Sequence, residues 1–110
     1  MLFSQNLAVQ NPSFEGPFGS GVTPSPWENC MSGQTPDTQP GSWGVSMSAS
    51  DGNSYIGLVG DADPSVWQEG ATQELLNELT GNPEPMQAGV TYQFTIDVSD
   101  HPTSGGWNVS

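Results

Sequence analysis

The apolar and polar positions of the chain alternate most regularly over Val90–Asp100. The apolar positions of this stretch are Val90, Tyr92, Phe94, Ile96 and Val98. Alternation with a period of two, in β-branched and aromatic residues, predicts a half-buried β-strand. Gly and Pro are frequent elsewhere in the chain, with 14 and 10 residues, and they favour turns over helices. We therefore predict an all-β fold, a β-sandwich of short strands joined by many turns.

Shorter patterns predict the other strands. Leu7 and Val9 alternate with polar residues ahead of Pro12, so Asn6–Glu15 is predicted to be a strand at a sheet edge. Ser54–Val59 is apolar on both faces, which is typical of a central, buried strand. Weaker patterns predict short strands at Pro26–Asn29, Trp43–Val45, 66–73 and Trp107–Ser110, and one helical turn at Glu74–Leu79.

The length of 110 residues supports one domain. About five strands are few for a sandwich with two covered faces, so we expect residues 6–110 to be the N-terminal part of one β-sandwich domain. Met1–Gln5 is an apolar pair followed by Ser and Gln, the pattern at the end of a secretory signal, and we interpret it as a remnant of one. No segment is long and apolar enough to span a membrane, so we expect a secreted or cell-surface protein.

The charge balance restricts the partners. The chain has 12 acidic residues, no Lys or Arg, and a formal net charge of −12. Nucleic-acid binding needs cationic side chains and is excluded, and anionic membrane surfaces are disfavoured for the same reason. Without basic side chains, each carboxylate must be solvated, hydrogen-bonded to backbone N–H groups, or bound to a cation. A solvated acidic surface accounts for most of these residues.

Catalytic chemistry is not indicated. Cys30 is the single cysteine, and His101 is the single side chain that could act as a base for its thiol, but no spacing links the two. A buried thiol, or a half-cystine whose partner lies after residue 110, is the favoured interpretation of Cys30. Glycoside hydrolysis needs two carboxylates on either side of one bond, and the sequence places no such pair. We therefore predict that the protein is not an enzyme.

The stretch Trp27–Gly60 combines many turn-forming residues with aromatic residues and few charges. This composition predicts an ordered loop on a β-scaffold, and such loops often carry function. Trp43 lies between Gly41 and Gly44, where the backbone can present an indole ring to solvent for stacking on a sugar. Core packing, or coverage of one end of the sandwich, is the structural alternative.

Three further residues of this stretch are candidates for ligand contact: Asp37, Trp27 and Tyr55. Asp37 could accept hydrogen bonds from sugar hydroxyls, although an aspartate in this setting more often bonds to its own backbone in an Asx-turn. Trp27 follows Pro26, and core packing is its main alternative.

Four oxygen-bearing side chains are candidate ligands of a structural Ca²⁺: Glu15, Asp51, Asn53 and Asp97. Ca²⁺ takes six to eight oxygen ligands, which loops of different elements can supply. Asp51-Gly52-Asn53 is a tight-turn sequence but lacks the other positions of an EF-hand. Asp97 lies on the polar face of the predicted strand, and simple solvation is its alternative.

A series of short motifs resembles one known family. In order along the chain they are NPSFEG, Trp-Glu-x-Cys, TPDTQPG, WGV, SDGNSYIGL, WQEGATQ and AGVTYQFTIDVS. Over residues 6–110 the series is similar to the galactose-binding-like domains at the N-termini of exported Bacteroidetes proteins with gliding-motility-type sorting signals. The resemblance implies a jelly-roll β-sandwich that continues for several more strands, secretion, and carbohydrate binding or adhesion. It also implies a structural Ca²⁺ near the first strand, with a carboxylate at Glu15.

Two hypotheses of function follow. The first is a secreted, non-catalytic module that binds a polysaccharide or cell-surface glycan. The second is a structural subunit of an extracellular filament or surface layer, in which self-assembly proceeds by strand exchange between chains.

Overall fold

The structure is a computed structural model that describes residues 6–61, 63, 65 and 68–99. These residues contain only short strands and no helix, which confirms the prediction of an all-β protein. None of them belongs to a helix that could cross a membrane. The strands are β1 (Leu7–Ala8), β2 (Glu28–Asn29), β3 (Asp37–Gln39), β4 (Tyr55–Gly57), β5 (Ala71–Thr72) and β6 (Leu76–Asn77).

The strands form three antiparallel pairs that are nested along the chain. β1 pairs with β6, β2 with β5, and β3 with β4, so the innermost pair in sequence is β3–β4. In that pair Asp37 lies opposite Gly57 and Gln39 lies opposite Tyr55. The chain therefore folds back on itself about the β3–β4 pair.

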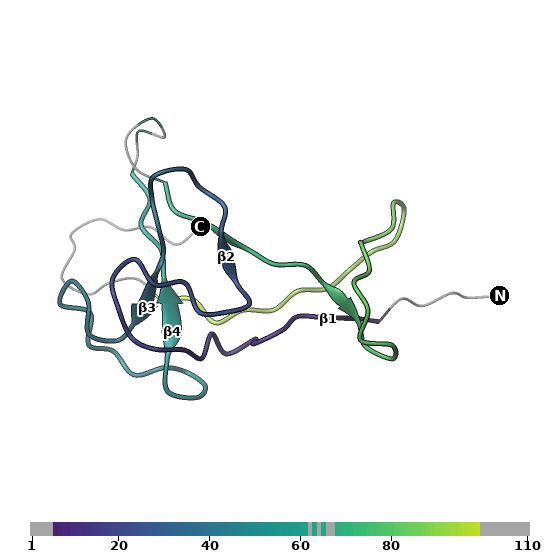
Figure 1. Cartoon of the computed structure of the whole chain (residues 1–110), viewed down its shortest axis with the longest axis horizontal. Coiled ribbons are helices and arrows are strands. Elements are labelled where there is room, and N and C mark those ends of the chain that lie inside the picture. The colour runs from purple at the N-terminus through teal and green to yellow at the C-terminus, as the bar shows by residue number, and fades with distance from the viewer. Residues whose placement is uncertain (1–5, 62, 64, 66–67, 100–110) are drawn as a thin grey trace.

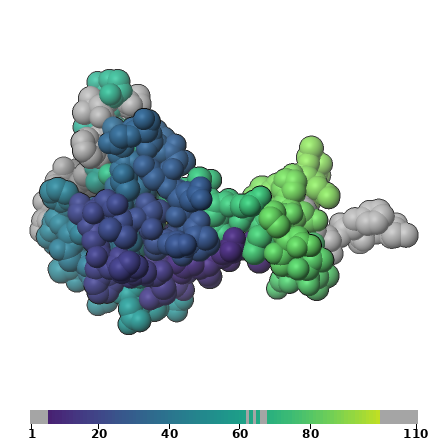
Figure 2. All heavy atoms as spheres, viewed as in Figure 1, coloured from purple at the N-terminus to yellow at the C-terminus, as the bar shows by residue number. Residues whose placement is uncertain are grey.

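The molecule is elongated, with extents of 52 × 30 × 24 Å. Figure 1 shows a larger lobe that contains β2, β3 and β4, and a smaller lobe built on the β1–β6 pair. In the space-filling view a narrow section joins the two lobes (Figure 2).

Hydrogen bonds, more than apolar packing, organise the interior of the larger lobe. Apart from the rings of Pro24 and Pro36, no apolar side chain among the described residues is buried, whereas all three residues of β3 are. Thr38 pairs with β4 on one side and exchanges two backbone hydrogen bonds of 3.0 Å with Gly19 on the other. Its hydroxyl donates to the carbonyl of Val22 at 2.7 Å. Polar groups are stable in such an interior when they are hydrogen-bonded, as the side chains of β3 are. The buried hydroxyl of Thr23 is an exception, because it has no hydrogen-bond partner among the described residues.

Several predicted strands are present in shorter form. β1 lies within Asn6–Glu15, β2 within Pro26–Asn29, and β5 within 66–73. β4 confirms a strand within Ser54–Val59, but the prediction of a central, buried strand is wrong. All three residues of β4 are half-buried, because β3 is the single strand that pairs with it in the described part of the chain.

Two predicted elements are replaced by other structure. The helical turn at Glu74–Leu79 is wrong, because Leu76 and Asn77 form β6 and pair with β1. Long-range pairing overrides the local helix propensity there. The strand at Trp43–Val45 is also wrong, since these residues belong to a turn closed by a hydrogen bond from the Val45 N–H to the Ser42 carbonyl at 3.0 Å.

The strand predicted most clearly is absent. Residues 90–99 form no strand with any described segment, and the apolar side chains of this stretch are largely exposed. Alternation creates one apolar face, but a strand also needs a neighbour for its N–H and C=O groups. β3, in turn, was not predicted, because it lies inside a stretch rich in turn-forming residues.

Some predictions concern residues outside the described ranges: the signal remnant at 1–5, the strand at Trp107–Ser110, and His101. The thiol of Cys30 is free and exposed, so the prediction of a buried thiol is wrong. The Cys30 sulfur lies against Gly70. A Cβ at that position would be 2.7 Å from the sulfur, so glycine makes room for the thiol.

Candidate functional site

Trp43 is the most prominent aromatic residue of the described surface, with 76% of the residue exposed. Its backbone has φ of 56°, a left-handed conformation that costs free energy for a residue with a side chain. Gly41 and Gly44 flank it with φ values of 117° and 76°, which glycine adopts without strain. The sequence prediction that Trp43 presents its ring to solvent is therefore consistent with its position.

The turn that carries Trp43 is anchored to the interior. The Gly41 N–H donates to the Val45 carbonyl at 2.8 Å, and the side-chain oxygen of Gln39 accepts from the Ser42 N–H at 2.9 Å. Gln39 belongs to β3 and is 2% exposed. The exposed indole thus stands on a turn whose base is tied to the most buried strand.

Asp37 is buried, and its carboxylate makes a structural hydrogen bond. Its residue is 4% exposed, and its Oδ1 accepts from the Gly21 N–H at 2.7 Å. This bond joins β3 to the loop at 19–21, which already pairs with Thr38. The Asx-turn alternative is not the contact observed here, because the donor lies 16 residues earlier in the chain.

Trp27 forms part of a half-buried cluster. Its ring stacks on Phe14 with centroids 4.8 Å apart, and its Nε1–H donates to the Asn11 carbonyl at 2.9 Å. The Asn11 side chain closes the same turn, with Nδ2–H groups donating to the carbonyls of Glu15 and Ser25 at 2.8 and 2.9 Å. These contacts agree with the alternative interpretation of Trp27, in which its ring packs inside the protein and does not contact a ligand.

Tyr55 is also held inside the lobe. Its hydroxyl donates to the Met47 carbonyl at 2.9 Å. Burial raises the pKa of the Tyr55 phenol above its usual 10. Of the four predicted ligand residues, Trp43 alone has an exposed side chain, while Asp37 is buried and Trp27 and Tyr55 are half-buried.

Glu15 forms a second candidate site with the turn at 51–54. Its Oε1 accepts from the N–H groups of Asn53 at 2.7 Å and Ser54 at 3.1 Å. The hydrogen bond from the Ser54 backbone, then that from Asn53, holds the pKa of the Glu15 carboxyl below 4.5. Gly52 lies against the same carboxylate, because a Cβ there would be 2.0 Å from Oε1. We call this arrangement the Glu15 clamp.

The structure brings three of the four predicted Ca²⁺ ligands together. Asp51 accepts a short hydrogen bond from the Ser13 hydroxyl, next to the clamp, whereas Asp97 lies exposed on the 90–99 stretch. The groups that face Glu15 Oε1 are N–H donors, which fit a carboxylate and not a cation. In the described ranges, no group of three or more His, Cys, Asp or Glu side chains is placed to hold a metal ion. The calcium site stays a prediction.

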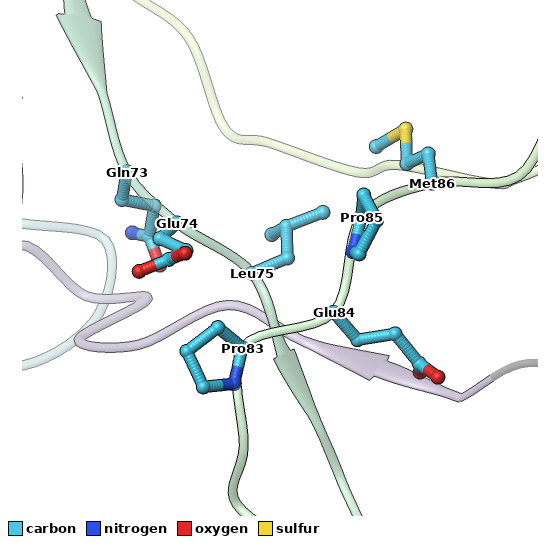
Figure 3. Close-up of a pocket in the computed structure, with 7 residues that line it drawn as sticks. All are labelled: Gln73, Glu74, Leu75, Pro83, Glu84, Pro85 and Met86. Atoms are coloured by element: carbon cyan, nitrogen blue, oxygen red, sulfur yellow. The ribbon is translucent and has the colours of Figure 1, made fainter.

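Sequence reasoning missed one cavity in the smaller lobe. It has a volume of about 500 Å³ and is lined by Gln73, Glu74, Leu75, Pro83, Glu84, Pro85 and Met86 (Figure 3). The carboxylates of Glu74 and Glu84 point away from each other, so this cavity does not present a carboxylate pair. No sequence signal marks the cavity. Its two walls, 73–75 and 83–86, are joined by the bridge between Leu76 and Pro83 and by the hydrogen bond from the Glu84 N–H to the Leu75 carbonyl at 2.9 Å.

No family model, no curated protein and no solved structure matches this chain.

Proposed function

We propose that the protein is a secreted, non-catalytic module that binds a polysaccharide or cell-surface glycan through Trp43. The observation that supports the proposal most directly is the 76% exposure of Trp43 on a turn anchored to β3. A jelly-roll β-sandwich is the proposed fold, in line with the all-β pattern and with the family resemblance.

An exposed indole suits a sugar because its flat, apolar face covers the C–H face of a pyranose ring. A turn that is already hydrogen-bonded loses little conformational freedom on binding, which favours affinity. The net charge of −12 repels anionic polysaccharides, so the proposed ligand is a neutral glycan. Asp37, Trp27 and Tyr55 do not contact the sugar in this proposal, because their polar groups are hydrogen-bonded within the chain.

Affinity electrophoresis in native gels that contain neutral polysaccharides, together with a glycan array, tests the proposal. We expect the wild-type protein to be retarded by at least one polysaccharide, and Trp43→Ala to migrate as in a gel without sugar. Phe18→Ala is the matched control, because Phe18 is another exposed aromatic residue, next to Gly19 that pairs with Thr38 of β3, and its substitution is expected to leave binding unchanged. The absence of retardation by every polysaccharide, or equal retardation of Trp43→Ala and wild type, would contradict the proposal.

A second candidate function is that of a structural subunit of an extracellular filament or surface layer. The observation that favours it is the exposed, alternating stretch within residues 90–99, which has no strand partner among the described residues. Size measurements on the purified protein separate the two functions, because a glycan-binding module does not require self-assembly.

A further inference from the structure

Residues 90–98, which we call the edge segment, concentrate exposed apolar side chains in one short stretch. Phe94, Ile96 and Val98 are 66%, 51% and 60% exposed, and Val90 is also exposed. All four lie at alternate positions, as on one face of a strand. Exposed apolar residues of this density mark a surface that another polypeptide covers.

Residues 93–98 of the edge segment also have a backbone that is available for pairing. No backbone hydrogen bond joins residues 93–98 to any other described residue. Figure 1 shows the yellow-green end of the chain as a long, uncoiled trace that runs from the smaller lobe back to the larger one. An uncoiled segment with unpaired N–H and C=O groups is a template for an added strand.

The composition of the edge segment favours pairing with an identical segment. Residues 90–96, VTYQFTI, contain no charge, no Pro and no Gly, and consist mainly of residues with high β-propensity. These are the features of segments that form intermolecular β-sheets with copies of themselves. Asp97 is the single charged residue of the edge segment, although the chain carries 12 acids.

We propose that the edge segment pairs with the edge segment of a second copy of this chain, in an antiparallel register centred on Phe94. In this register Phe94 faces Phe94, Tyr92 faces Ile96, and Val90 faces Val98. All the apolar side chains then meet across the pair, on one face. The proposal does not depend on glycan binding by Trp43.

The position of Asp97 selects the antiparallel register. In a parallel, in-register pair the Asp97 side chains of the two copies lie opposite each other, which is destabilising. In the antiparallel register Asp97 lies opposite Thr91, and Gln93 opposite Thr95, so no like charges face one another. The whole chains still repel each other, with a net charge of −12 each, and salt screens this repulsion. Self-association is therefore expected to strengthen with NaCl.

Sedimentation velocity on the full chain, over a range of protein and NaCl concentrations, tests the existence of the pair. We expect a reversible monomer–dimer equilibrium that shifts to dimer as NaCl rises from about 10 mM to about 500 mM, where the Debye length falls several-fold. Phe94→Lys puts two ammonium groups at the centre of the pair and is expected to weaken dimerisation at least tenfold. Leu79→Lys is the matched control, because Leu79 is exposed outside the edge segment and its substitution leaves the dimer intact.

A charge substitution tests the register. Thr91→Lys places an ammonium group opposite Asp97 of the other copy at two symmetry-related positions, and is expected to strengthen dimerisation by roughly twofold to thirtyfold. Thr95→Lys changes the net charge equally but faces Gln93, so it serves as the control and has the smaller effect. Weaker dimerisation of Thr91→Lys overturns the antiparallel register. A monomer under all conditions, or loss of dimer in Leu79→Lys but not in Phe94→Lys, overturns the proposal itself.

Discussion

Gly52→Ala is the substitution whose effect the structure defines most closely. Gly52 has φ of 71°, and an added Cβ would lie 2.0 Å from Glu15 Oε1 and 2.8 Å from Glu15 Cδ. Two effects therefore combine at this position. The first is the cost of a left-handed backbone for a residue with a side chain, and the second is a collision with the Glu15 clamp.

The two effects differ in size and in their dependence on Glu15. The left-handed conformation costs roughly 1–2 kcal/mol for an L-residue. The collision can be relieved only by moving the carboxylate, which breaks its hydrogen bonds to the N–H groups of Asn53 and Ser54. Gly21 separates the contributions, because its φ is 68° and no heavy atom lies within 4 Å of an added Cβ. Gly21→Ala is expected to show the backbone cost alone.

Thermal and urea denaturation provide the assay. For a small domain, 1 kcal/mol corresponds to a change in Tm of roughly 4–8 °C, so Gly21→Ala is expected to lower Tm by roughly 4–16 °C. Gly52→Ala is expected to lower it further. In a Glu15→Ala background, Gly52→Ala is expected to cost no more than the Gly21 control, because the colliding atoms are gone. Equal effects of Gly52→Ala with and without Glu15 would refute the clamp.

Three other outcomes follow from the same contacts. Because the pKa of Glu15 is depressed by the N–H groups of Ser54 and Asn53, its contribution to stability is present above pH 4.5 and is lost as the pH falls through the folded-state pKa. Wild type is thus expected to have a larger free energy of unfolding than Glu15→Gln at pH 7, and this difference is expected to disappear in acid. A difference that stays constant between pH 7 and pH 3 would argue against this. Melts in CaCl₂ and in NaCl of equal ionic strength are expected to coincide, because donors face Glu15 Oε1; a calcium-specific rise in Tm that Glu15→Gln abolishes would establish the calcium site. Trp27→Phe keeps the stacking on Phe14 but loses the hydrogen bond to the Asn11 carbonyl, so it is expected to lower the free energy of unfolding by about 1 kcal/mol in urea.

Local pattern predicted the class of structure but not the pairing. The apolar run Ser54–Val59 contains β4, since its β-branched and aromatic residues favour extended backbone in any context. The burial of β4 depends on how many strands pair with it, and no local pattern encodes that number. β6 shows the same limit, because Leu76 and Asn77 have no strand pattern of their own and become a strand only through β1.

The candidate site was predictable to a similar extent. The exposure of Trp43 follows from its two glycine neighbours, which is local information. The proximity of Glu15 to Asn53 was also expected, although as shared metal ligation and not as a bond from a carboxylate to backbone N–H groups. The cavity at Gln73–Met86 was not predictable, because its walls meet through the bridge between Leu76 and Pro83, in a segment whose local pattern predicted a helical turn.

Because the chain has no Lys or Arg, backbone N–H groups are important hydrogen-bond donors to its carboxylates. Glu15 accepts from Asn53 and Ser54, Asp37 from Gly21, and Glu69 from Val59, and each bond joins segments at least 10 residues apart. A chain with basic residues could neutralise the same carboxylates with mobile side chains. Here the donors belong to the main chain. Each of these carboxylates therefore holds a backbone segment in place when it accepts its hydrogen bond. The described lobes thus hold these three carboxylates with backbone N–H groups, and those of Asp51 and Glu84 with the side-chain donors of Ser13 and Asn77.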